Sequence, residues 1–268
     1  MSAASLPMYD LPELRWATDR WWAGLARAFE DAGMADVPAT LDRGADYAAI
    51  WRRPDLLFSQ TCGYPLMHEL RGRVRLVATP RYSAPGCAGA EYCSVVLVRR
   101  DDGAGDIARL RGARCAVNGL DSQSGYSALR TLVAPHAERG RFFGEVTVSG
   151  GHCASIELVA SGRADVAAVD CVTHGLLSRQ RPAAVADVRV LCRTAAAPNL
   201  PFITGPAADD DLLGRLRAGL EQAFADCALA EAREALMLAG CEFLPLAAYE
   251  RILDIEREAF ALGYRAVA

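Results

Sequence analysis

The sequence predicts an α/β protein in which short buried strands form mixed, mostly parallel sheets flanked by helices. Short apolar runs recur along the chain and most are separated by helical patterns, the alternation that builds parallel sheet. The 268 residues are 52% hydrophobic and 23% charged, which is typical of a globular protein. At this length a single core begins to divide, so one large domain or two lobes is expected. The expected strands are 4–8, 56–59, 74–79, 94–98, 114–117, 146–148, 166–169 and 188–191.

The clearest helical patterns lie at the two ends of the chain. The first helix is expected to start at Pro12, because proline is favoured at the first helical position, and to end at Gly33, a C-cap glycine. Its tryptophans are interpreted mainly as packing residues. The final third predicts three helices in succession, over 209–226, 229–239 and 246–263.

Two apolar segments, 92–98 and 193–203, are interpreted as crossings between lobes. They predict a first lobe made of residues 1–94 and 198–268, which contains both termini, and a second lobe of residues 95–197. A ligand cleft is expected between the two lobes, where binding sites commonly form.

The charge composition excludes several kinds of function. The net charge is −4 and the 29 basic residues are all arginine. Without a basic stripe, no nucleic-acid partner and no direct insertion into a membrane are expected. Without lysine, Schiff-base and P-loop lysine chemistry are excluded. No stretch is long and apolar enough for a membrane span.

The N-terminus, MSAASLPM, lacks the basic and apolar regions of an export signal. This pattern favours the cytoplasm, or the periplasm if a leader has been removed from the chain. The nine cysteines include no C-x-x-C pair and are expected to be mostly buried thiols. Cys87 and Cys93, in one glycine-rich loop, could form a local disulfide in an exported protein. The four histidines have no metal-site spacing, and neither a metal nor a cofactor is expected.

Two hydroxyl-rich turns carry the main chemical signal. The first, DSQSGYS at 121–127, follows an apolar run, and the second, SGGHCAS at 149–155, follows a shorter strand-like run. Each precedes a helical pattern. The first turn of a helix has unpaired N–H groups and the positive end of the helix dipole, so serine and glycine there allow an oxyanion to approach. Two such turns in matched positions indicate one shared ligand.

Four segments in order resemble the phosphate/phosphonate-type substrate-binding proteins of ABC transporters. They are DLLFSQTCGY at 55–64, YCSVVLVRRD at 92–101, LRGARCAVN at 110–118 followed by SQSGY at 122–126, and GHCAS at 151–155 continuing to GRADVAAVD at 162–170. The resemblance covers about residues 50–205. It implies a two-lobed type II periplasmic-binding-protein-like fold, a small oxyanion ligand such as phosphate, phosphite or a phosphonate, and a possible ABC transporter permease as partner.

The resemblance also implies the residues of the binding site. Gln60 and Thr61 would serve the first lobe and Tyr92 its hinge side; Tyr9 is added because it follows the first strand. The oxyanion would be held by Ser122, Ser124, Gly125, Tyr126 and His152. Asp170 would accept a hydrogen bond from a protonated ligand oxygen or from an amine. Such an acceptor favours hydrogen phosphate over sulfate.

Two alternatives stay open at the level of sequence. Ser122, Ser124 and Asp170 could act only as helix caps, and His152 as a satisfied histidine at a helix start. Leaderless proteins of this fold also resemble menaquinone-pathway enzymes that act on small carboxylic acids. In such an enzyme His152 would be a general base, and the two serines would hold a carboxylate. The binding protein is the favoured interpretation, with no catalytic residue assigned.

Overall fold

The computed structural model describes residues 2–44 and 46–268 and divides into two compact units. Unit 1 comprises residues up to Ser83 together with Pro198–Ala248, and unit 2 comprises Ala84–Ala197 and Tyr249–Ala268. The chain passes from unit 2 back to unit 1 at Pro198. The other predicted boundaries differ, because residues 84–94 and 249–268 belong to unit 2 rather than to the lobe that holds the N-terminus.

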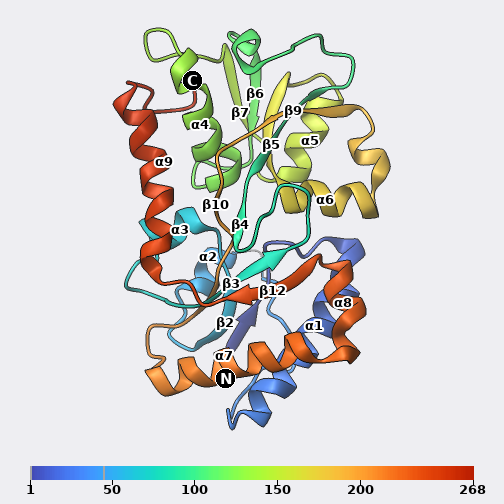
Figure 1. Ribbon diagram of the computed structural model, residues 1–268, viewed down its shortest axis with the longest axis vertical. Helices are drawn as coiled ribbons and strands as arrows, with labels where there is room; N and C mark the ends of the chain where they lie inside the picture. The colour runs from blue at the N-terminus through green and yellow to red at the C-terminus, as the bar shows by residue number, and fades with distance from the viewer. Residues whose placement is uncertain (1, 45) are drawn as a thin grey trace. The chain divides into compact units, whose positions relative to one another are not determined.

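Unit 1 contains a sheet in the order β1-β2-β11-β3-β12, of which Figure 1 labels β2, β3 and β12. Strands β1 and β2 are parallel, whereas β11 runs antiparallel to both of its neighbours, and β12 is antiparallel to β3. The strands are β1 (Ala3–Ser5), β2 (Leu56–Gln60), β3 (Arg75–Tyr82), β11 (Phe202–Thr204) and β12 (Leu238–Glu242). The helices are α1 (Arg15–Asp31), α2 (Tyr47–Trp51), α3 (Gly63–His68), α7 (Asp210–Ala225) and α8 (Ala230–Ala235).

Aromatic packing joins the first helix to the sheet of unit 1. Helix α1 packs on α7 and α8, and its buried Phe29 lies 5.4 Å from Phe58 of β2, measured between ring centroids. Phe58 in turn lies 5.1 Å from Phe202 of β11. Such pairs bury large apolar areas with favourable ring geometry. The expected strand at 4–8 is shorter, and the helix expected from Pro12 begins as a 3-10 turn before α1.

Unit 2 contains a sheet in the order β7-β6-β8-β5-β9. Its strands are β5 (Ser94–Arg99), β6 (Arg114–Val117), β7 (Glu145–Val148), β8 (Val166–Asp170) and β9 (Val188–Arg193), preceded by the short β4 (Glu91–Tyr92). Strand β6 is parallel to β7 and β8, and β5 is antiparallel to β8 and β9. The helices are α4 (Ala128–Val133), α5 (His152–Ala160), α6 (Cys171–Gln180) and α9 (Glu250–Ala261).

The sheets are mixed, as the sequence predicted, and β5 and β11 run antiparallel to their neighbours. One expectation about secondary structure needs correction. The helix expected over 229–239 ends at Ala235, and β12 follows. Met237 has φ +56°, a left-handed conformation that a helix cannot continue through, and the next residues pair with β3. The short β10 (Ala197–Pro198) lies at the second crossing.

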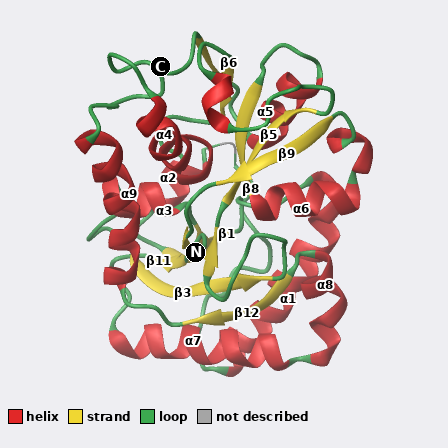
Figure 2. Cartoon of the chain, turned by 45° about the horizontal axis from the view of Figure 1, so that its top comes forward, coloured by secondary structure: helices red, strands yellow, loops and turns green. Residues whose placement is uncertain are grey.

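The last helix belongs to unit 2 because a buried ion pair and packed rings hold it there. Helix α9 packs beside α4 (Figure 2). Arg130 of α4, whose side chain is 3% exposed, donates to Glu256 of α9 at 2.8 Å and to the carbonyl of Arg265 at 3.1 Å. The same guanidinium lies over the ring of Phe260, 4.8 Å from its centroid. The sequence pattern identified the helix but not its partner.

Replacing Glu256 by alanine is expected to lower the free energy of unfolding by about 3–5 kcal/mol, because the buried Arg130 cation loses its carboxylate partner. The matched control is Glu157→Ala, also on a helix, whose partner Arg163 is exposed. It should cost no more than about 1 kcal/mol. Urea unfolding of both variants measures the difference, and equal losses would contradict the importance of the buried pair.

Candidate functional site

Polar residues gather at one edge of the unit 2 sheet. The parallel strands β6, β7 and β8 end there, so Asn118, Ser149 and Asp170 lie at adjacent strand ends. Strand β5 begins at the same edge, with Ser94 opposite Asp170. The carboxyl ends of parallel strands are the usual place for ligands in α/β proteins. This edge is therefore the candidate site.

The first hydroxyl-rich turn forms a hydrogen-bonded loop at this edge. Ser122 caps the helix, and its Oγ accepts from the backbone N–H of Gly125 at 3.1 Å. Ser124 Oγ lies 2.9 Å from His152 Nε2 and 3.4 Å from Ser122 Oγ. Ser94 Oγ donates to the carbonyl of Ser124 at 2.9 Å, which fixes the turn on β5. Residues 123–127 form a π-helical turn that leads into α4, a local irregularity that often marks functional sites.

The second turn supports the start of α5. Ser149 Oγ and Ser155 Oγ lie 2.7 Å apart, and Ser149 also bonds to the carbonyls of Val117 and Gly151. Gly150 has φ +86°, a conformation that favours glycine. These bonds place His152, the first residue of α5, against the first turn. The two turns predicted from sequence are thus brought together by the Ser124–His152 contact. We call Ser122, Ser124, Gly125, His152 and Asn118 the cradle.

Several polar atoms in or beside the cradle are buried without a hydrogen-bond partner in the part of the chain that the structure describes. They are Asn118 Oδ1, Gln123 Oε1, Ser127 Oγ and His152 Nδ1. An unsatisfied buried polar atom costs about 1–3 kcal/mol, so such groups are rare unless they have a purpose. Their concentration around one turn is the feature expected of a site that binds a polar ligand.

Gly125 is required by close packing inside the cradle. A Cβ built on Gly125 would lie 1.9 Å from Asn118 Oδ1 and 3.2 Å from His152 Cε1. Any other residue would displace the Asn118 side chain. The sequence predicted that this glycine lets an anion approach. In the structure its lack of a side chain leaves space for the Oδ1 atom of Asn118.

His152 is neutral at pH 7. Burial lowers the pKa of its imidazole from 6.5 to about 4. At neutral pH only one ring nitrogen therefore carries a hydrogen, and which of the two does so depends on the tautomer. A neutral imidazole bonded to Ser124 contributes a dipole to the cradle but no full charge.

Asp170 is a helix cap. It is 1% exposed, and its Oδ1 accepts from the backbone N–H groups of Val172 at 2.7 Å and Thr173 at 3.0 Å. The capping interpretation therefore describes part of its role, and contact with a ligand remains a prediction.

The two predicted tyrosines of unit 2 are both buried. The ring of Tyr126 lies in the hydrophobic core of the unit, below the guanidinium of Arg130, and its hydroxyl accepts from the N–H of Val267 at 3.4 Å. Tyr126 thus faces the C-terminal segment, and its link to the cradle is through the backbone of the turn. Tyr92 is 2% exposed at the end of β4.

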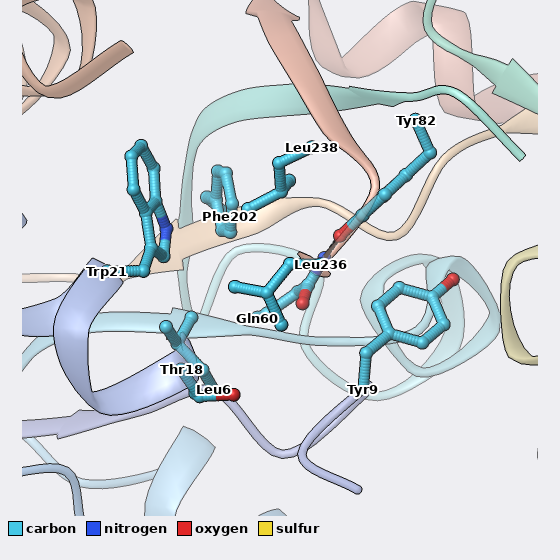
Figure 3. Close-up of a pocket in the computed structure, with 9 residues that line it drawn as sticks. All are labelled: Leu6, Tyr9, Thr18, Trp21, Gln60, Tyr82, Phe202, Leu236 and Leu238. Carbon is cyan, nitrogen blue, oxygen red and sulfur yellow. Dashed lines mark hydrogen bonds between the residues drawn. The ribbon is translucent and has the colours of Figure 1, made fainter. Parts of the chain in front are cut away.

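The predicted residues of unit 1 lie together within that unit. Gln60, at the end of β2, donates from Nε2 to the hydroxyl of Tyr82 at 2.8 Å and to the carbonyl of Leu200 at 2.9 Å (Figure 3). Both amide hydrogens are thereby used within unit 1. Tyr9 packs edge-on against Tyr82, with 5.1 Å between ring centroids. The N–H of Thr61 donates to the carbonyl of Pro201 at 3.1 Å.

A small cavity of about 20 Å³ lies beside Gln60, with room for a single water molecule. Its other lining residues are largely apolar and include Tyr9, Trp21 and Tyr82 (Figure 3). This cavity is too small for an organic ligand. In the described part of unit 1, the main role that the contacts of Gln60 indicate is to position Tyr82.

The list of site residues drawn from sequence omitted several that the structure places at the strand edge. Asn118 and Ser149 directly follow strands β6 and β7, so their positions at strand ends were a usable signal. Ser94 and Ser127 gave no such signal, because a serine at the start of a strand or inside a helix is common. No three histidine, cysteine or acidic side chains among the described residues are arranged to hold a metal ion.

Solved structures share the fold: PhnD1 from Prochlorococcus marinus in complex with methylphosphonate is 15% identical, with a TM-score of 0.76 and 98% of each chain covered. A binding protein component of an ABC phosphonate transporter from Pseudomonas aeruginosa is 15% identical, with a TM-score of 0.75, covering 98% of this chain and 87% of that one. A protein from Xanthomonas citri bound to ATP is 17% identical, with a TM-score of 0.72 and 98% of each chain covered.

Family membership follows from the sequence itself. The family model of ABC transporter phosphonate periplasmic substrate-binding proteins matches residues 19–242, and this chain belongs to that family. The resemblance noted in the sequence is confirmed. The family consists of substrate-binding proteins of ABC transporters, and the Pseudomonas aeruginosa structure is such a component. No curated protein matches the sequence significantly. No described helix is long and apolar enough to cross a membrane.

Gly125→Ala is expected to destabilise the protein by about 1–3 kcal/mol, because the new methyl group must displace Asn118. Gly214→Ala is the control: Gly214 lies inside α7 with no atom within 4 Å of a new Cβ. That change should stabilise the protein by up to about 1 kcal/mol. Thermal and urea unfolding measure both, and a neutral Gly125→Ala would show that the close packing is not needed.

Stability should fall as the pH is lowered from 6.5 to 4. The unfolded chain protonates His152 near pH 6.5, whereas the folded protein resists protonation until about pH 4, so added protons favour unfolding. Burial also lowers the pKa of His174, which adds to the same trend. Urea unfolding of His152→Gln across this range should show a shallower pH dependence than wild type. His136→Gln, outside the cradle, should keep the wild-type slope; identical slopes in all three proteins would refute the assignment.

Proposed function

We propose that this protein captures a small phosphorus oxyanion, such as phosphate, phosphite or a phosphonate, at the cradle of unit 2. The observation that carries the proposal is the group of buried polar atoms without hydrogen-bond partners in and beside the cradle, which also contains the Ser124–His152 hydrogen bond. These atoms are arranged at the strand edge where α/β proteins bind ligands. Membership of the phosphonate-binding family supports the same class of ligand.

The cradle binds an anion through dipoles rather than through a countercharge. Ser122, Ser124 and the first turns of two helices supply hydroxyl and N–H donors. When His152 carries its hydrogen on Nε2, it donates to Ser124 Oγ, and the Ser124 hydroxyl then donates its own hydrogen to a ligand oxygen. Each hydrogen bond to a charged group is worth about 1.5–3 kcal/mol, so five or six support micromolar binding once ordering costs are included.

Asp170 gives the site its selectivity in this proposal. Beyond capping α6, its carboxylate accepts a hydrogen bond from a protonated ligand oxygen. Hydrogen phosphate carries such a proton at neutral pH, and the monoanions of phosphite and of phosphonates also carry one, whereas sulfate does not. A carboxylate facing an unprotonated sulfate oxygen would repel it, so sulfate is discriminated against.

The proposal includes the compartment and partner of the family. One solved relative of the same fold is in complex with methylphosphonate. The family's periplasmic location and its association with an ABC transporter extend to this chain as part of the proposal. Contact of Tyr9, Gln60, Thr61 and Tyr92 with a ligand stays a prediction.

Ser124→Ala is expected to weaken binding of the ligand by about 10- to 100-fold, because the variant loses one hydrogen bond to an anion. The ligand is first identified by thermal unfolding of phosphate-free protein with phosphate, phosphite, methylphosphonate, 2-aminoethylphosphonate, sulfate and a panel of carboxylates. A ligand at 100 times its Kd adds about 2.7 kcal/mol to stability. Titration calorimetry then compares wild type and variant.

The matched control is Ser161→Ala, at the other end of α5, whose hydroxyl bonds to the carbonyl of Glu157. It should bind the ligand as wild type does. A selective response to phosphorus oxyanions that is absent with sulfate supports the proposal. Stabilisation only by carboxylates, or unchanged affinity in Ser124→Ala, would overturn it.

A further inference from the structure

Three cysteine thiols cluster in unit 2 next to the start of α6. Cys87 Sγ lies 3.6 Å from Cys171 Sγ, although the two residues are 84 positions apart. The thiol of Cys93 is also close, because Gly86 lies against both Cys93 Sγ and Cys171 Sγ. All three are free thiols in the structure. The sequence suggested a bond between Cys87 and Cys93, but the fold places Cys171 between them.

Glycine at position 86 allows this close approach. Gly86 has φ +115°, and a Cβ built on it would lie 3.0 Å from Cys93 Sγ and 3.3 Å from Cys171 Sγ. The loop therefore lies directly on the two sulfurs, and the thiol of the next residue is brought to Cys171.

We propose that Cys87 and Cys171 form a reversible disulfide by exchange with a small external disulfide such as oxidised glutathione. A disulfide has its sulfurs about 2.05 Å apart, so the two must approach by roughly 1.5 Å. Cys87 lies in a loop that can supply this shift. The backbones of Cys93 and Cys171 are held to each other, since the N–H of Cys171 donates to the carbonyl of Cys93 at 3.1 Å.

Exposure sets the order of the two steps. Cys87 is half-buried, whereas Cys93 is 7% and Cys171 1% exposed. The Cys87 thiolate attacks the external disulfide and releases one thiolate, leaving a mixed disulfide on Cys87. The Cys171 thiolate then attacks the Cys87 sulfur and releases the second thiolate. The protons lost by Cys87 and Cys171 convert the leaving thiolates into two thiols, so one external disulfide is reduced.

Both buried thiols are slow to act first. The neighbouring thiol of Cys171, together with burial, raises the pKa of the Cys93 thiol. The hydrogen bond to Cys87 raises the pKa of the Cys171 thiol. Since the thiolate is the nucleophile, initial attack falls to Cys87. The product ties the loop before β4 to the first residue of α6, closing a long stretch of chain, which favours stabilisation.

The test is disulfide mapping of the full chain after equilibration in a mixture of reduced and oxidised glutathione. The protein is quenched in acid, denatured, alkylated and digested without reduction. Trypsin alone leaves Cys87 and Cys93 in one peptide, so cleavage after Glu91 is added to separate them. The expected product joins the Cys87 and Cys171 peptides, with Cys93 alkylated. Free Cys87, Cys87 joined to Cys93, or only glutathione on Cys87 would overturn the proposal.

Thermal unfolding supplies a second readout. Oxidised wild type should unfold several degrees above the reduced protein. Cys87→Ser, in a half-buried loop, should lose this shift, whereas Cys227→Ser, an exposed cysteine elsewhere, should keep it. Circular dichroism of the reduced variants checks that both fold. A shift retained in Cys87→Ser would contradict the assigned pair.

Discussion

The missing side chain of Gly125 is the constraint on which the cradle depends. The turn approaches Asn118 so closely that a Cβ has no space, and this approach brings Ser124 to His152. The strand edge, the π-helical turn and the start of α5 all meet there. The cost is a set of buried polar atoms without partners, which a core selected only for stability would avoid. These unpaired atoms destabilise the turn locally, which is the feature expected if a ligand supplies the missing hydrogen bonds.

The cradle contains no arginine although the chain has 29 basic residues, all of them arginine. Arg130 lies on α4, the helix that follows the first hydroxyl-rich turn. Its guanidinium is already bonded to Glu256 and to the C-terminal segment. Burial keeps His152 neutral, so the site presents dipoles and a single capping carboxylate, Asp170. Recognition by dipoles favours a ligand that can both accept and donate hydrogen bonds. A site built on arginine would attract any anion, whereas in the proposed function recognition at the cradle depends on the protonation state of the ligand.

Much of the fold could be predicted from the chain because its signals are local. Strands 94–98, 114–117 and 166–169 agree with the structure to within a residue at each end, since continuous apolar runs leave little choice. The missed strand β12 depends on pairing with β3 and on the left-handed Met237, neither of which has a clear local pattern. Among the site residues, Ser124 and His152 were recognised by motif. Their 2.9 Å contact depends on how β6 and β7 pair and could not be read from spacing.

The amino-acid order alone specified the α/β class, the two hydroxyl-rich turns and the family, because periodicity, turn chemistry and motif order are carried by neighbouring residues. The fold decided which distant residues meet. It joined the last helix to unit 2 through Arg130 and Glu256, turned Tyr126 into the core, and placed Cys171 rather than Cys93 beside Cys87. These outcomes depend on long-range packing, where many weak interactions are satisfied together and no short stretch of sequence contains the answer.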